Sequence, residues 1–311
     1  MISRDAINRA AQRIAPHVRR TPVVEITVES VALPVTLKLE LLQHSGSFKA
    51  RGAFNTLLGA DIGAAGVATA SGGNHGAAVA YAAQRLGAKA KIFVPEIASP
   101  AKVARIASYG AEIVQQGSHY DEALALCEAW IAASGATSVH AYDAEPTLEG
   151  QGTLGRELEA QAPGLDTLLV AVGGGGLIGG IAAWYQSGVK IIGVEPVTCN
   201  TLHAALAAGQ RVAVKPSGLA TDSLGASTVG RLMFEIAKDH VAEVALVSDD
   251  DIRNAQRVLW RELQLVSEPG GAAAFAALLS GAYRPEKDER VGVIVCGANT
   301  SMDVFGKLFP Q

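Results

Sequence analysis

A doubly wound α/β protein is the fold that this sequence predicts, and three observations predict it. Short apolar runs of strand length alternate with alanine-rich helical stretches along most of the chain. Several of these strands occur in strand, helix, strand units, which imply parallel pairing with right-handed crossovers. Glycine-rich turns directly follow some of the strands. Open α/β sheets bind ligands beyond the carboxyl ends of their strands, which is where these turns fall.

The first two units lie between residues 66 and 116. Gly87 is expected to close the first helix. Ser99 is the expected N-cap of the second helix, with Pro100 at its first position and Gly110 at its end. The expected strands here are 66–71, 90–95 and 111–116, and the expected helices are 74–87 and 99–110.

The same alternation resumes after residue 165. The expected strands are 166–172, 189–196, 241–248 and 290–296, and the expected helices are 177–186 and 249–264. Glu268 precedes a further, alanine-rich helix that begins with a proline, so a capping role is one interpretation of this carboxylate. No low-complexity linker divides the chain, and the domain boundary must therefore come from motifs.

Composition excludes several function classes. The 311 residues are 49% hydrophobic, enough for a large core, and the net charge of -4 with dispersed signs gives no basic face for nucleic acid. No apolar run reaches the roughly 18 residues of a membrane span, and the N-terminus lacks the apolar core of a signal peptide. The three cysteines show no metal or disulfide spacing. We expect a soluble cytoplasmic protein.

The richest motif is LLVAVGGGGLIGG, residues 168–180. A buried strand runs into four glycines and then into a helix, so the backbone amides of Gly173, Gly174, Gly175, Gly176 and Leu177 can converge on an anion. Side chains would block that approach. The Walker pattern is absent, which argues against a nucleoside triphosphate.

The same glycines allow a second interpretation. Gly174, Gly176 and Gly179 satisfy GxGxxG, and Glu195 ends the next strand about 20 residues further on, as in a dinucleotide-binding fingerprint. A nicotinamide-dependent oxidoreductase would use them in this way. That interpretation leaves two other features without a purpose, Lys49 and the segment SGGNHG.

Lys49 lies in HSGSFKARGAF, among small, hydroxylated and glycine residues. A solvated surface lysine is the ordinary interpretation. SGGNHG, residues 71–76, is a second glycine-rich turn from a strand into a helix, although a simple turn with Asn74 as helix cap also explains it. A third loop, 293–303, closes a buried strand with Cys296. Three such loops and one lysine together favour a ligand site.

These segments also carry a family resemblance. SGSFKARGA, SGGNHG, GQGT, GGGGLIGG and CGAN stand in this order, and the chain from about residue 20 to 296 resembles the fold-type II pyridoxal-phosphate enzymes. Within them it is similar to the threonine and serine dehydratase branch, which also contains serine racemases. The resemblance implies a tryptophan synthase β-like fold of two doubly wound open-sheet domains with the cofactor in the cleft between them. We expect a large domain of residues 1–52 and 145–311 and a small, mobile domain of residues 53–144.

The resemblance also implies roles for single residues. Lys49 looks like the Schiff-base lysine, with Phe48 as a further cofactor contact. The remaining cofactor contacts it implies are Asn74 at the ring oxygen, Gly173, Gly174, Gly175, Gly176 and Leu177 at the phosphate, and Cys296 at the pyridine nitrogen. The residues it places against the substrate carboxylate are Ser71, Gly72, Gly73 and His75.

The implied reaction is β-elimination. A free Lys49 amine could take the Cα proton of a β-hydroxy amino acid such as L-threonine or L-serine, and loss of the hydroxyl would lead to a 2-keto acid and ammonia. A neutral thiol at the ring nitrogen favours elimination over transamination. Racemases of this branch carry a serine at the position of Gly72, so we predict little racemase activity. A racemase or a β-replacement synthase of the same fold remains the alternative.

Further expectations come from the family. Several members bind a divalent cation near the point where this chain reads GLATDSLGAS, so a monovalent or divalent cation is possible and Asp222 is a weak candidate ligand. A cap or turn role is the other interpretation of Asp222. In relatives the region of Glu268 lies near the cofactor ring, which is the second interpretation of that carboxylate. A homodimer is expected from precedent, acting on a small-molecule amino acid, with no nucleic-acid or membrane partner.

Overall fold

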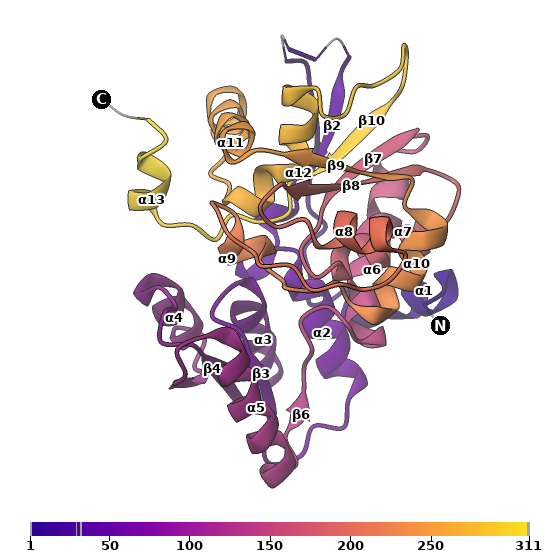
Figure 1. Ribbon diagram of the computed structural model, residues 1–311. Helices are drawn as coiled ribbons and strands as arrows, with labels where there is room; N and C mark the ends of the chain where they lie inside the picture. The colour runs from indigo at the N-terminus through magenta and orange to yellow at the C-terminus, as the bar shows by residue number, and fades with distance from the viewer. Residues whose placement is uncertain (1, 29, 32, 310–311) are drawn as a thin grey trace.

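Two lobes, each built around its own sheet, make up the computed structural model, which describes residues 2–28, 30–31 and 33–309 (Figure 1). The strands are β1 (Val23–Ile26), β2 (Val35–Lys38), β3 (Val67–Ala70), β4 (Ala90–Val94), β5 (Glu112–Gln115), β6 (Thr137–Ser138), β7 (Thr167–Ala171), β8 (Lys190–Pro196), β9 (Glu243–Val247) and β10 (Val291–Ile294). The larger sheet has six strands in the order β1-β2-β10-β7-β8-β9, and the smaller has four in the order β5-β4-β3-β6.

Parallel pairing dominates both sheets. In the small sheet β3 pairs in parallel with β4 and β6, and β4 with β5, which confirms the parallel pairing expected of the first two units. In the large sheet β7 pairs in parallel with β8 and β10. The exception is the edge strand β1, which runs antiparallel to β2, since residues 27–34 between them are fewer than the dozen or so that a parallel crossover needs.

The helices lie mainly on the faces of these sheets. They are α1 (Arg4–Ile14), α2 (Lys49–Gly59), α3 (Asn74–Leu86), α4 (Pro100–Ala107), α5 (Tyr120–Ser134), α6 (Glu145–Gln161), α7 (Gly176–Tyr185), α8 (Thr201–Ala208), α9 (Thr221–Leu224), α10 (Arg231–His240), α11 (Asp249–Leu263), α12 (Pro269–Ser280) and α13 (Met302–Gly306), with short 3-10 turns at Glu40–Leu42 and His44–Gly46. The predicted cap of α4 is confirmed, since Ser99 Oγ accepts a hydrogen bond from the Lys102 amide. Gly87 ends α3 in the left-handed conformation, also as predicted.

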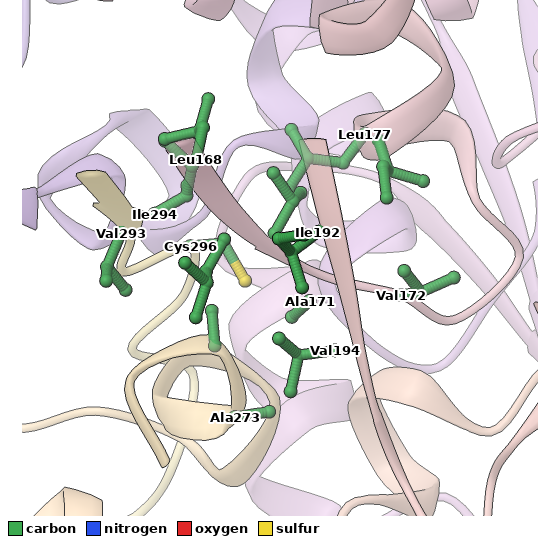
Figure 2. Packing of buried hydrophobic residues seen from close by; sticks show 14 of the residues in the cluster. Leu168, Ala171, Val172, Leu177, Ile192, Val194, Ala273, Val293, Ile294 and Cys296 are labelled. Carbon is green, nitrogen blue, oxygen red and sulfur yellow. The ribbon is translucent and has the colours of Figure 1, made fainter. Parts of the chain in front are cut away.

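The main apolar core fills the space between the large sheet and its helices. Figure 2 shows side chains of β7, β8 and β10 packing together with Ala273 of α12. Cys296, just beyond β10, belongs to this cluster and is buried. A separate core lies under α3 and β4 in the smaller lobe. Each lobe therefore has apolar packing of its own.

Strand ends set the positions of the candidate residues. The glycine loop follows β7, Cys296 follows β10, and Ser71 follows β3. All three cysteines are buried, and none is paired with another. Among the described residues, no helix is long and apolar enough to cross a membrane. The proposed domain boundaries at residues 53 and 144 stay a prediction.

Candidate active site

Lys49 is the first residue of α2, and the backbone before it fixes its position. Ser47 forms an antiparallel bridge with Gly297, and the Phe48 amide donates to the Cys296 carbonyl (3.1 Å). This pairing brings the start of α2 against the end of the β10 segment. The Lys49 ammonium lies 5.1 Å from the centroid of the Phe48 ring. Two segments nearly 250 residues apart in sequence thus form one edge of the site.

The Lys49 amine is held in a poorly hydrated position. Its Nζ donates to the carbonyl oxygen of Ala141 (2.8 Å). Removal from water lowers the pKa of Lys49 to about 8, although nearby Cys296 and Glu268 favour the charged form. About a tenth of this amine is therefore neutral at pH 7, far more than for an ordinary lysine, and the neutral form is the one that can act as nucleophile or base.

Three polar side chains form a chain of hydrogen bonds beside this lysine. Asn74 Nδ2 donates to Glu268 Oε1 (2.6 Å), and Asn299 Nδ2 donates to Asn74 Oδ1 (2.5 Å) and to the Ser45 carbonyl (2.9 Å). Glu268 is buried, and burial raises the pKa of this carboxyl to about 7 despite the hydrogen bond from Asn74. Asn74 is therefore locked in one orientation from both ends of its amide.

The loop between β7 and α7 has the properties of an anion cradle. Gly175 precedes α7 with a φ of +88°, a conformation that other residues adopt only with strain. A Cβ added at Gly174 would lie 2.4 Å from the Tyr142 ring, and one at Gly175 would lie 2.4 Å from Met233. In the described structure, no backbone amide of residues 173–177 donates a hydrogen bond. These amides, at the positive end of a helix, fit a phosphate group.

The second glycine-rich turn leads into α3. The Gly73 amide donates to Ser71 Oγ (3.2 Å), and a Cβ added at Gly72 would lie 2.9 Å from the Cβ of Ala98. His75 is buried, and its Nε2 lies 2.9 Å from the Val139 carbonyl oxygen. Burial, aided by the charge of Lys49, lowers the pKa of His75 to about 3, so the ring is neutral. His75 therefore joins α3 to the strand end that leads to Ala141.

Cys296 lies in an apolar setting. Its Sγ donates to the Gly270 carbonyl at the start of α12 (3.4 Å). Burial, with Glu268 nearby, raises the pKa of the thiol well above its usual range. The thiol is consequently protonated at physiological pH and offers a neutral partner to whatever group approaches it.

Asp222, the weak candidate for a metal ligand, has another partner. Its carboxylate on α9 pairs with Lys102 Nζ on α4 at 3.0 Å, and the side chain is 79% exposed. No group of three or more His, Cys, Asp or Glu side chains suited to a metal ion occurs in the described part of the chain. This ion pair thus joins α9 of the larger lobe to α4 of the smaller one, two helices that are labelled in Figure 1.

Glu195 is the acidic residue that the dinucleotide interpretation of the glycine loop requires, but it binds elsewhere. Glu195 is fully buried and accepts hydrogen bonds from the Leu202 and His203 amides (2.8 Å each) at the start of α8. Gly179 serves helix packing, since a Cβ there would lie 2.7 Å from Met233 Cβ. With its carboxylate capping a helix, Glu195 has no free oxygen directed at a ribose.

A buried charge network lies below the start of α2. Arg51 is 1% exposed and contacts both oxygens of Glu40, with Nε–Oε1 at 2.6 Å and Nη2–Oε2 at 3.0 Å. Its Nη2 also binds Glu157 Oε2 on α6 (3.0 Å), and Glu157 in turn pairs with Lys38 of β2. The network therefore ties the turn carrying Lys49 to the large sheet and to α6.

Sequence reasoning missed several of these groups. For Glu268 it left open a capping role and a position near the cofactor ring, and the structure shows no capping hydrogen bond from this side chain. It did not single out Ala141, Tyr142 or Asn299. Asn299 lies within the CGAN motif and could have been noted there. The carbonyl of Ala141 has no side-chain signal, so only the tertiary structure places it beside Lys49.

Comparison with known proteins identifies the family of the chain. A family model described as "Pyridoxal-phosphate dependent enzyme" matches residues 14–297. A phenylserine dehydratase from Ralstonia pickettii is 39% identical over 97% of this chain and 94% of its own length. An L-threonine ammonia-lyase from Geobacter sulfurreducens is 37% identical over 90% of this chain and 71% of its own. The structure of maize serine racemase has a TM-score of 0.93 at 32% identity, covering 98% of this chain and 96% of that one.

Proposed function

This chain belongs to the family of pyridoxal-phosphate dependent enzymes, and from that premise we propose that it is an ammonia-lyase acting on β-hydroxy amino acids. Elimination of the β-hydroxyl from a substrate such as L-threonine or L-serine, followed by hydrolysis, gives a 2-keto acid and ammonia. Relatives named phenylserine dehydratase and L-threonine ammonia-lyase support this reaction type. The observation that carries the proposal is the Lys49 amine, shielded from water and partly neutral.

The residues present fit the cofactor. The unpaired amides of the glycine loop would hold its phosphate, Asn74 would face its ring oxygen, and Cys296 would face its ring nitrogen, with Phe48 beside Lys49. When bound, pyridoxal phosphate supplies the electron-withdrawing ring that makes the α-proton of an amino acid acidic. Lys49 would anchor the cofactor and, once released by substrate, take the α-proton at Nζ.

Other residues of the chain would orient the substrate. The amides of residues 74–76 at the start of α3 donate no hydrogen bond in the described structure and would receive the substrate carboxylate, next to Ser71, Gly72 and Gly73. His75 would contribute by holding the Val139 carbonyl, which keeps the following residues beside Lys49. The protonated Cys296 thiol would leave the ring nitrogen without an added charge, which favours elimination.

Racemisation is the alternative reaction of this fold. It needs a second acid or base on the face opposite the lysine. Gly72, where racemases of this branch carry serine, offers no side chain, and the nearby His75 ring is neutral with its Nε2 bound to Val139. We therefore infer that elimination exceeds racemisation here. We further propose that the enzyme is a homodimer, as the resemblance to dehydratases implies, and that it is cytoplasmic, the expectation drawn from its composition.

One assay tests the proposed function. The cofactor-loaded enzyme is incubated with L-serine and L-threonine, and ammonia, 2-keto acid and the D-amino acid are measured together. We expect equal amounts of ammonia and keto acid, and formation of D-serine slower by at least about tenfold, because one of the two acid/base groups that inversion needs is absent. D-serine formation as fast as ammonia release would instead identify a racemase. Absence of both products would contradict the proposal.

A further inference from the structure

We propose that Tyr142 and Tyr120 form an aromatic subsite for the β-substituent of the substrate, so that the enzyme prefers β-hydroxy amino acids carrying an aromatic ring at Cβ. The inference rests on the proposed function and deepens it by naming the substrate class. It follows from where the two tyrosines lie relative to Lys49 and the glycine loop.

Tyr142 lies between these two parts of the site. It directly follows Ala141, whose carbonyl binds the Lys49 amine at 2.8 Å. Its ring covers Gly174 so closely that a Cβ there would be 2.4 Å from two ring carbons. The ring of His140 meets it edge to face, with centroids 5.1 Å apart. The half-buried Tyr142 ring thus lies against the anion cradle, on the residue next to the one whose carbonyl binds the amine.

The backbone around Tyr142 is firmly held. His140 Nδ1 accepts hydrogen bonds from the Tyr142 amide (3.2 Å) and the Asp143 amide (2.9 Å). Asp143 Oδ1 in turn accepts from the Leu232 amide at the start of α10 (2.8 Å). An aromatic wall fixed in this way is suited to contribute specificity, because little conformational entropy is lost when a substrate binds against it.

Tyr120 is a second tyrosine, close enough to Tyr142 for the two side chains to interact electrostatically. It is the first residue of α5 and is 43% exposed, and it belongs to none of the apolar clusters. Partial burial raises the pKa of Tyr120 to about 12, and the charge of a nearby ionised Tyr142 is the second cause of this increase. The two hydroxyls therefore lie within electrostatic range of each other. A half-exposed ring near Tyr142 has no packing role that explains it.

The direction of the β-substituent follows from the tetrahedral Cα. The carboxylate would go to the amides at the start of α3, and the α-proton would face Lys49 Nζ. The bond to Cβ must then point away from α3. Tyr142 follows the residue that binds the Lys49 amine and lies against the glycine loop, so its ring is placed to meet a substituent on that bond.

An acidic substituent is the competing possibility, because α4 carries two cations near the site. Lys102 is already paired with Asp222, however, and Glu268 lies close enough to both Lys102 and Arg105 for their charges to act on its pKa. A carboxylate entering this region would meet Glu268 as well as Arg105. The uncharged faces of two tyrosines carry no such penalty and interact favourably with a phenyl ring.

The test compares kcat/KM of the holoenzyme for L-threo-phenylserine, L-serine and L-threo-3-hydroxyaspartate, with keto-acid release as the readout. We expect phenylserine to be preferred over serine by about tenfold or more, and Tyr120→Ala to lower that ratio by about 3- to 10-fold. Tyr142→Leu, which keeps apolar bulk over Gly174, is expected to lower the ratio similarly at unchanged cofactor content. Phe309→Ala removes an aromatic side chain of matched exposure, 40%, on the C-terminal segment and should leave the ratio unchanged.

Each other outcome overturns the inference. Equal preference for phenylserine and serine in the unaltered enzyme, or variants that reduce both substrates alike, would show that the tyrosines do not form the subsite. Preference for 3-hydroxyaspartate would assign the β-substituent to the Arg105 side. If none of the substrates releases keto acid from enzyme with full cofactor content, the proposed function itself fails, and this result is distinct from a changed ratio.

Discussion

Replacing Lys49 with arginine is expected to lower kcat/KM for elimination by at least ~10³-fold while the protein still folds. Arginine keeps the positive charge and a similar length, but its guanidinium cannot be deprotonated in a protein. It can therefore neither join the cofactor nor take the α-proton, whereas the Lys49 amine has its pKa lowered to about 8 by burial. The measurement is keto-acid release at saturating cofactor, with circular dichroism as the test of folding.

Lys89→Arg is the matched control for this substitution, because Lys89 is exposed and lies in the turn after α3. Its activity should equal that of the unaltered enzyme. Activity of Lys49→Arg within tenfold of the control would mean that a different group performs the proton transfer.

Replacing Arg51 with methionine is expected to destabilise the protein by about 3–5 kcal/mol. The substitution removes the only cation in contact with Glu40, which is fully buried, and one of two cations on Glu157 among the described residues. An uncompensated buried carboxylate must stay ionised without a partner or take up a proton, and both cost free energy. Urea unfolding of the holoenzyme at pH 7 measures the difference.

Arg253→Met serves as the matched control, since Arg253 pairs with Asp250 in an exposed i,i+3 bridge on α11 whose side chains are 39% and 90% exposed. An exposed pair of this kind contributes less than about 1 kcal/mol. Equal losses of stability in the two variants, at equal m-values, would show that the buried network around Arg51 stabilises the fold no more than an exposed ion pair does.

The parallel units were predictable because each carried its own local signals. Ser99 and Pro100 mark the start of α4, and Gly87 marks the end of α3 with a left-handed backbone. The antiparallel edge strand β1 and the two-residue strand β6 carried no comparable signal. Both owe their strand conformation to pairing with a neighbour, β2 or β3, and pairing of this kind is a tertiary effect.

The candidate site likewise contains residues that the sequence indicated and contacts that it did not. Lys49 and the glycine loop were found from sequence because each is an unusual local pattern at the junction of a strand or turn with a helix. Their surroundings come from distant segments. The carbonyl of Ala141 contacts Lys49 across 92 positions, and Asn299 reaches Asn74 across 225. The residue pattern within one segment cannot predict contacts with such distant segments.

The link between Lys49 and the cofactor is the claim on which the proposed function depends, and hydride trapping tests it most directly. Borohydride adds hydride to the carbon–nitrogen double bond between lysine and cofactor and leaves a stable secondary amine. Peptide mass spectrometry of the treated holoenzyme should then find one phosphopyridoxyl group per chain, on Lys49. The same group on another lysine, or on none, would contradict the proposed role of Lys49.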